Sequence, residues 1–187
     1  MILARYFLFI IAFSFSNCLF SQPLLITKTG EISFFSETPV EDIKAVNKKV
    51  YSTIHTETGS IQFLLNISEF SFKYAAMQKH FNDEDYMYTE KYPNASFKGS
   101  MINKEAVDFT KEGTYKVLVE GDLNMHGVTN RIKTKATFDV RNGMISATAV
   151  FPVRLEDYKI KVPKIVIKKI AEVIEVTVNC QYQSIKN

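Results

Sequence analysis

Apolar and polar residues alternate along most of the chain, and the alternation is clearest on the two sides of His126-Gly127. The stretches before and after this pair would each turn one apolar face toward a common core. The apolar positions are Tyr115, Val117, Val119, Leu123 and Met125 before the pair, and Ile132, Thr134, Ala136, Phe138 and Val140 after it. A period of two over this length, with the opposite face polar, predicts an antiparallel hairpin.

The same alternation predicts strands in the rest of the chain. They are expected at residues 31–37, 45–54, 60–67 with a continuation through Phe70 and Phe72, 95–102, 145–152 and 170–183. Asn142-Gly143 adds a second hairpin, because Asn-Gly supplies the positive φ angles of a type I′ turn. About eight strands at this spacing predict an all-β fold, a closed antiparallel barrel.

Residues 73–93 interrupt the strand pattern. Tyr74, Met77 and Phe81 follow helical spacing, and no glycine breaks the stretch. The acidic run that follows is expected to cap a second short helical turn over residues 85–89. We therefore expect a short helical insert that lies as a flap over an open end of the barrel.

Composition fits this interpretation and excludes some partners. The length of 187 residues suits a single domain with a substantial core. The chain has 15 Phe and 9 Tyr but only 7 Gly and 5 Pro, which is typical of a β protein. The net charge of +3 comes from interspersed charges of both signs, so nothing indicates a nucleic-acid partner.

The N-terminal residues have the features of a signal peptide. Arg5 precedes an apolar run at residues 6–13, which is too short to span a membrane, and small polar residues follow. We expect residues 1–21 to be removed and residues 22–187 to form the barrel domain, exported to the periplasm or secreted. A lipid anchor on Cys18 is the alternative, but the three residues before it make a poor lipobox, so anchoring is not expected.

The other cysteine, Cys180, falls on the apolar phase of Val178 and Tyr182 near the end of the chain. With Cys18 removed it has no partner for an internal disulfide. Its position predicts a buried, inert thiol rather than a nucleophile.

Three segments resemble motifs of the YceI-like family. Residues 121–129 (Gly-Asp-Leu-Asn-Met-His-Gly-Val-Thr) resemble its central G-(D/E)-L-T-(I/L)-(H/R)-G-V-T segment, and residues 92–99 (Tyr-Pro-Asn-Ala-Ser-Phe-Lys-Gly) its Y-P-x-(A/I)-x-F-K-(S/G) strand. Residues 77–81 stand where the family has a helical segment. The resemblance implies a lipocalin-like barrel of eight strands whose apolar interior holds a long isoprenoid chain. It also implies export and no catalytic residues.

The interior of an eight-stranded barrel either fills with its own side chains or holds one narrow ligand. Alternation fits both cases, and the resemblance favours a cavity for a long-chain lipid or isoprenoid. Gly121 would leave room on the inner face, and Met77 and Phe81 would close the mouth. The predicted cavity lining is Phe63, Leu65, Phe70, Phe72, Met77, Phe81, Val117, Val119, Gly121, Phe138 and Phe151. The alternative is a filled barrel that serves as a structural or interaction module of the cell envelope.

An enzyme is the third hypothesis, as a metal-dependent hydrolase. His55, His80 and His126 lie apart in the sequence, without metal-ligand spacing such as H-E-x-x-H. A site would require His80 and an acidic neighbour to meet a second histidine in space. His126 is more simply a turn residue beside Gly127, so we expect no catalytic residue, metal or cofactor.

A cluster of lysines lies late in the chain, at Lys159, Lys161, Lys164, Lys168 and Lys169. These side chains could contact a phosphate headgroup or an anionic membrane, which allows a peripheral contact with a membrane. A solvated charged face is the other interpretation.

Overall fold

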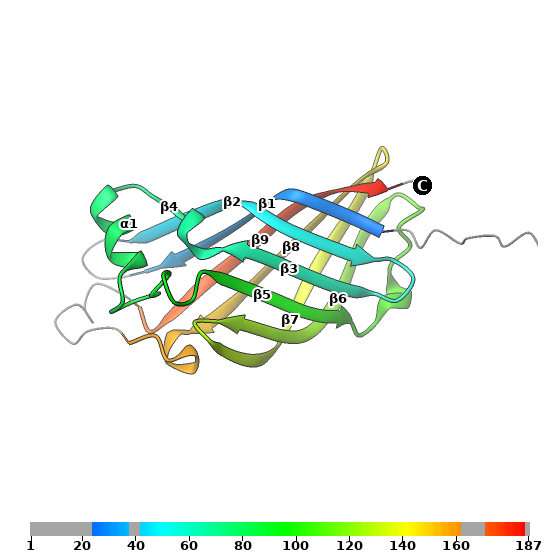
Figure 1. Ribbon diagram of the computed structural model, residues 1–187. Coiled ribbons are helices and arrows are strands. Elements are labelled where there is room, and N and C mark those ends of the chain that lie inside the picture. Colours follow the sequence, from blue (N-terminus) through cyan, green and yellow to red (C-terminus); the bar gives the residue numbers. More distant parts are fainter. Residues whose placement is uncertain (1–23, 38–41, 162–170, 186–187) are drawn as a thin grey trace, which may run out of the picture.

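The computed structural model describes residues 24–37, 42–161 and 171–185, and its strands form one antiparallel barrel (Figure 1). In chain order the elements are β1 (Leu24–Ser36), β2 (Ile43–His55), β3 (Ser60–Asn66), the 3-10 turn η1 (Ile67–Glu69), β4 (Ser71–Phe72), α1 (Ala75–Asn82), β5 (Asn94–Met101), η2 (Lys104–Ala106), β6 (Gly113–Met125), β7 (Val128–Arg141), β8 (Met144–Arg154), η3 (Leu155–Tyr158) and β9 (Val173–Ile185). The predictions for residues 1–21, and for Lys164, Lys168 and Lys169, concern residues outside these ranges.

Pairing between β1 and β2 closes the sheet. The strand order is β1-β9-β8-β7-β6-β5-β3-β2, and β1 pairs with β2 from Leu24↔His55 onward to complete the ring. The short β4 lies outside this ring. It pairs with β2 at Ala45↔Phe72, on the edge that β3 occupies further along. The predicted barrel of eight strands is confirmed, with one additional strand where η1 interrupts the expected continuation of β3.

Two tight turns fix the register of β6, β7 and β8. His126 and Gly127 have φ angles of 53° and 72°, and Asn142 and Gly143 have φ angles of 50° and 74°. Positive φ at both central residues defines the type I′ turn, whose twist matches that of the strands it joins. Both predicted hairpins are therefore confirmed, and His126 occupies the turn as expected.

The insert after β4 places one helix across an end of the barrel, at the left of Figure 1. This helix, α1, confirms the helical spacing found in the sequence. The prediction of a second helical turn over residues 85–89 is wrong. The amides of Tyr86 and Tyr88 both donate to the carbonyl oxygen of Asp83, at 3.1 and 3.0 Å, and Tyr88 has a φ of 44°. A residue in the left-handed region ends any helical repeat, so the segment forms separate turns.

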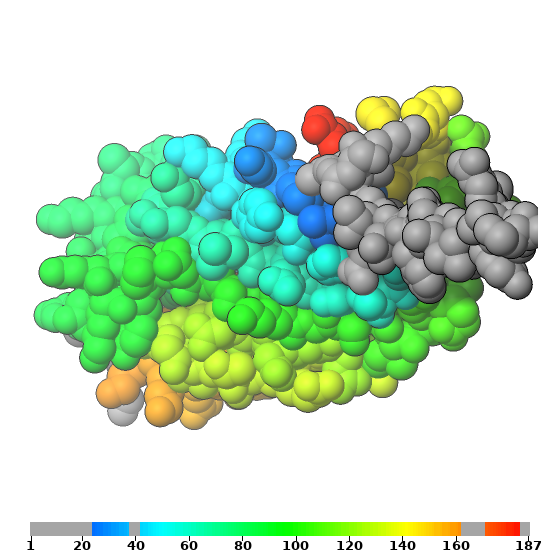
Figure 2. Space-filling model, turned by 45° about the vertical axis from the view of Figure 1, so that its right-hand side comes forward, coloured from blue at the N-terminus to red at the C-terminus, as the bar shows by residue number. Residues whose placement is uncertain are grey.

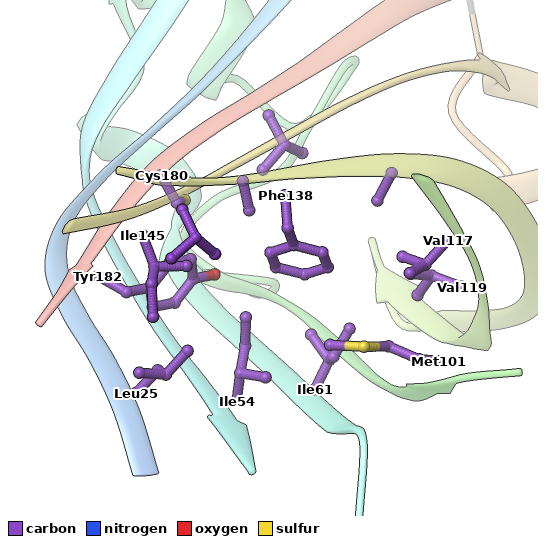
Figure 3. Packing of buried hydrophobic residues seen from close by; sticks show 14 of the residues in the cluster. Leu25, Ile54, Ile61, Met101, Val117, Val119, Phe138, Ile145, Cys180 and Tyr182 are labelled. Carbon is purple, nitrogen blue, oxygen red and sulfur yellow. The ribbon is translucent and has the colours of Figure 1, made fainter. Parts of the chain in front are cut away.

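The other end of the barrel is filled by side chains. Figure 3 shows the ring of Phe138, which is 1% exposed, at the centre of a cluster to which the surrounding strands contribute. The residues labelled around it are Leu25, Ile54, Ile61, Met101, Val117, Val119, Ile145, Cys180 and Tyr182. A polar contact at this depth joins the hydroxyls of Ser52 and Tyr182, 2.8 Å apart, so neither oxygen is buried without a partner.

Cys180 lies inside this filled end, as the sequence predicted. Its side chain is 1% exposed, and burial raises the pKa of the thiol to about 11. Burial disfavours the thiolate, which is the nucleophilic form of cysteine. The folded protein therefore holds this thiol protonated at neutral pH.

The raised pKa of Cys180 predicts a loss of stability at alkaline pH. An unfolded thiol has a pKa of about 8.5, so the folded state binds the proton more tightly. The tighter proton binding of the folded state stabilises the fold in full below about pH 8.5, and this stabilisation is lost as the pH rises toward 11. We expect the difference in free energy of unfolding between wild type and Cys180→Ala to fall by about 2 kcal/mol from pH 8.5 to 10.5, measured by urea denaturation. A difference that stays constant over this range would contradict the burial of a protonated thiol.

Candidate ligand-binding cavity

A cavity of about 520 Å³ lies between the filled end of the barrel and α1. Its size falls in the range of roughly 300–1,000 Å³ that is typical of small-molecule sites. Among the described residues, no Asp, Glu, Lys or Arg lines it, and most of the lining side chains are aliphatic or aromatic. The strands around it form a continuous outer wall in the face that Figure 2 shows. The cavity is therefore suited to an apolar ligand.

Small side chains on two neighbouring strands make this part of the barrel hollow. Thr134 and Ala136 of β7, and Ala147 and Ala149 of β8, all line the cavity. Ala136 pairs directly with Ala149 across the two strands. Because an eight-stranded barrel is only wide enough for large side chains to meet at its axis, small ones leave space. The sequence predicted which residues of these strands face inward. The small size of four of these residues is the feature of the sequence that indicates a cavity.

Apolar residues that point inward but remain partly exposed mark the wall of the cavity. Leu123, Ile132 and Phe151 are half-buried although each lies on the inner phase of its strand and lines the cavity. Phe138, three inner positions beyond Ile132 on β7 and within the filled end, is fully buried. The interior therefore changes from packed to open along the barrel axis. This change distinguishes the protein from a barrel that side chains fill throughout.

Four phenylalanine rings close the barrel at the end near α1. They come from β1, the end of η1, β4 and α1, and the ring centroids of five of their pairs lie 4.9–5.8 Å apart. The four are Phe34, Phe70, Phe72 and Phe81. Rings at these distances attract one another by about 0.5–1.5 kcal/mol for each pair beyond their burial. They hold α1 over the mouth of the cavity.

The helix itself has little else to keep it in place. It is eight residues long, none of them is buried, and Tyr74 at its N-cap makes no side-chain capping hydrogen bond. A helix this short is marginal without tertiary contacts. Segments with few buried contacts open locally at low free-energy cost. The geometry at α1 therefore matches a flap, as expected from the sequence.

Nine of the eleven predicted lining residues lie on the cavity wall. They are Phe63, Leu65, Phe70, Phe72, Met77, Phe81, Val119, Phe138 and Phe151. Their contact with a ligand stays a prediction. Val117 does not line the cavity, because it lies one inner position farther from the mouth than Val119 and packs in the filled end (Figure 3). Alternation identified its face correctly but carries no information on depth along the barrel.

Gly121 does not line the cavity either, and the expectation that it leaves room there is wrong. It pairs across the strands with Gly99, and the ring of Phe97 lies over both. A Cβ atom at position 121 would lie 2.6 Å from Cζ of Phe97 and closer still to the Cα atom of Gly99. The space that a side chain at position 121 would need is thus occupied by the Phe97 ring and by the backbone of Gly99.

The cavity wall also contains residues that the sequence analysis did not select. They include Phe34, Phe97, Leu123, Met125, Ile132, Ala136, Ala147, Ala149, Ile174 and Val176. Most lie on inner phases that alternation had identified. Their assignment to the wall depends on where the filled end stops, which is set by contacts between strands distant in sequence.

A second, polar pocket of about 470 Å³ lies beside the mouth. It is lined by Glu84, Asp85, Tyr86, Tyr88, Tyr92, His126, Lys159 and Lys161. Tyr86 lines both this pocket and the apolar cavity, so the two spaces adjoin. Nδ1 of His126 lies 3.0 Å from the carbonyl oxygen of Tyr158, and its ring contacts that of Tyr92 with centroids 4.6 Å apart. We call this site the polar pocket.

The histidines do not converge. His80 lines the apolar cavity and His126 the polar pocket, while Nδ1 of His55 is buried elsewhere. The described residues contain no group of three or more His, Cys, Asp and Glu side chains placed to hold a metal ion. Within the same ranges, no helix has the length and apolar character needed to cross a membrane.

Comparison with known proteins relates the chain to one family. A family model described as the YceI-like domain matches residues 25–182, which is most of the chain. The UPF0312 protein of Pseudomonas savastanoi pv. phaseolicola is 36% identical over 83 residues, 44% of this chain and 40% of that protein. UPF0312 protein plu2095 of Photorhabdus laumondii is 32% identical over 74 residues, 40% of this chain and 34% of that protein. These alignments therefore span less than half the length of either relative.

Solved structures share the fold. A polyisoprenoid binding domain from Saccharophagus degradans superposes with a TM-score of 0.71 at 15% identity, covering 87% of this chain and 98% of that one. BcnA from Burkholderia cenocepacia gives a TM-score of 0.68 at 14% identity, with coverages of 82% and 95%. At such identities the likeness concerns the barrel architecture.

The contact between Gly121 and Gly99 can be tested by adding one methyl group. Alanine normally stabilises a strand interior relative to glycine by about 0.5–1 kcal/mol. Here we expect Gly121→Ala to lower the free energy of unfolding by about 1–3 kcal/mol, because the new Cβ overlaps Gly99 and Phe97. Urea denaturation measures the change, and Lys116→Ala on the outer face of β6 is the control, with an expected effect within about 0.5 kcal/mol. A Gly121→Ala variant at least as stable as wild type would contradict the close approach.

Proposed function

The chain belongs to the YceI-like domain family, and from this premise we propose that it is an exported, non-enzymatic binding protein that holds a long apolar ligand, an isoprenoid or another lipid. The observation that carries the proposal is the uncharged, apolar cavity of about 520 Å³ with one end filled by the protein's own core. The name of the Saccharophagus degradans structure, a polyisoprenoid binding domain, supports an isoprenoid as the ligand.

Apolar burial supplies the binding energy in this proposal. Each buried methylene group contributes roughly 0.8 kcal/mol, so a chain of many such units binds tightly without specific polar contacts. The wall discriminates by the width and length of the ligand, because it offers few polar groups to select a particular chemistry. A chain enters from the end covered by α1, since the opposite end is packed around Phe138.

Export and lack of catalysis complete the proposal. Export is supported by the signal-peptide features of the first 21 residues. A binding role without catalysis is supported by the cavity wall, whose described lining contains no Asp, Glu, Lys or Arg and a single histidine, His80. Tyr74, which is 44% exposed beside the mouth, and the exposed Lys79 could contact a membrane surface while a ligand passes.

The alternative of a filled structural barrel is disfavoured by the cavity itself. A barrel packed throughout would bury the inner residues Leu123, Ile132 and Phe151 completely, yet all three are half-buried. The hydrolase alternative would need histidines that converge, and His80 and His126 line different spaces.

Narrowing the cavity should weaken binding without unfolding the barrel. Ala149 lines the cavity, and a phenylalanine there would occupy the space of the ligand. We expect Ala149→Phe to weaken binding of a C20 isoprenoid alcohol at least about tenfold, with Ala149→Leu intermediate. Displacement of a fluorescent fatty acid measures the affinity, and circular dichroism confirms the fold.

The neighbouring position provides the matched control. Val150 lies on the same strand, points outward and is 53% exposed, so Val150→Phe should leave the affinity unchanged. Native mass spectrometry of protein purified from its own source should show a bound apolar molecule. Equal loss of affinity in both phenylalanine variants, or no binding by the wild type, would refute the proposal.

A further inference from the structure

The polar pocket adjoins the apolar cavity at Tyr86, whose side chain lines both spaces. A chain held in the cavity therefore has its outer end beside a second space of comparable volume. We propose that the polar pocket binds the headgroup of an amphiphilic ligand, and that this headgroup carries no net charge. The inference rests on the proposed function, because it assigns the polar end of the molecule whose apolar chain fills the barrel.

The charges around the polar pocket cancel. Lys159 and Lys161 contribute two positive charges, and Glu84 and Asp85 contribute two negative charges. A diphosphate would gain from the lysines but would meet two carboxylates, and an ammonium group would face the opposite conflict. A neutral headgroup with both hydrogen-bond donors and acceptors avoids both penalties.

The hydrogen-bonding groups of the pocket suit a hydroxyl or carbonyl headgroup. A carbonyl oxygen only accepts, so the short contact to Tyr158 requires Nδ1 of His126 to carry a proton and donate. In the neutral imidazole, Nε2 is then an acceptor. The lysine ammonium groups donate, and the hydroxyls of Tyr88 and Tyr92 can do either. The pocket thus offers both types of partner to an uncharged polar group.

The backbone around the pocket is constrained in a manner common at binding sites. Four non-glycine residues among the described ones have positive φ, and three of them line the polar pocket. These are Tyr88, His126 and Lys159, with φ angles of 44°, 53° and 57°. The amide of Lys159 also donates to the carbonyl oxygen of Glu156 at 2.9 Å. Such backbone conformations are costly and persist where the surrounding structure fixes them, so the three side chains project from well-defined positions.

Ligands that share one chain and differ only at the headgroup test the inference. Geranylgeraniol, geranylgeranyl diphosphate and geranylgeranylamine are titrated at pH 7.5 and moderate salt into the purified protein. We expect the alcohol to bind about tenfold or more tightly than either charged analogue. Tightest binding by the diphosphate would overturn the assignment, as would equal affinities for all three ligands.

Charge variants sharpen the test. Neutralising the carboxylates in Glu84→Gln/Asp85→Asn should raise the affinity for the diphosphate about tenfold relative to that for the alcohol, since the two lysines then dominate. Lys159→Met should favour the amine instead. Glu90→Gln, an exposed position outside the pocket, is the control and should change neither affinity. Unaltered preferences in the pocket variants would overturn the headgroup site.

The outcomes separate this inference from the proposed function. Failure of all three ligands to bind would refute the apolar cavity as a ligand site and the headgroup site with it. Binding of all three with equal affinity, abolished by Ala149→Phe, would support the cavity and refute the headgroup site alone.

Discussion

Hydrogen bonds between β1 and β2 close the sheet, and this closure sets the width that every inner side chain has to fill. A ring of eight strands leaves an interior in which large side chains from opposite walls just meet. Around Phe138 they do meet, and that end is solid. Nearer to α1, where β7 and β8 carry Thr134, Ala136 and Ala149, they do not, and the same closed ring encloses a hollow. The cavity thus follows from a fixed circumference combined with local side-chain size.

Much of this architecture could be predicted from the sequence, because its determinants are local. Alternation identifies the strands and their inner faces, and the His126-Gly127 and Asn142-Gly143 turns define their hairpins. Depth within the barrel is not local. Val117 and Val119 share one face of one strand, yet only Val119 reaches the cavity. The place of Gly121 depends in the same way on Gly99 and Phe97 across the sheet, which a pattern along one strand cannot reveal.

The polar pocket illustrates the same limit for the site. Its lining comes from the turns after α1, the β6–β7 hairpin and the segment after η3. The lysine cluster was recognised in the sequence as a candidate for a phosphate or a membrane surface. The structure places Lys159 and Lys161 with Glu84 and Asp85, so the positive charges of the lysines face an equal number of carboxylates. In the proposed binding mode, the apolar cavity and the polar pocket together give an amphiphilic molecule one favourable orientation.

The four small side chains on β7 and β8 have a consequence for how such a barrel can diversify. Strand pairing in this region involves backbone groups, so the hydrogen-bonded ladder itself does not depend on a particular side chain at these inner positions. Each added or removed methyl group at Ala136, Ala147 or Ala149 would change the girth of ligand that fits, with the hydrogen-bonded frame intact. If the barrel binds the proposed ligand, single substitutions at these positions would therefore change which ligand fits, while the backbone pairing of the two strands stays the same.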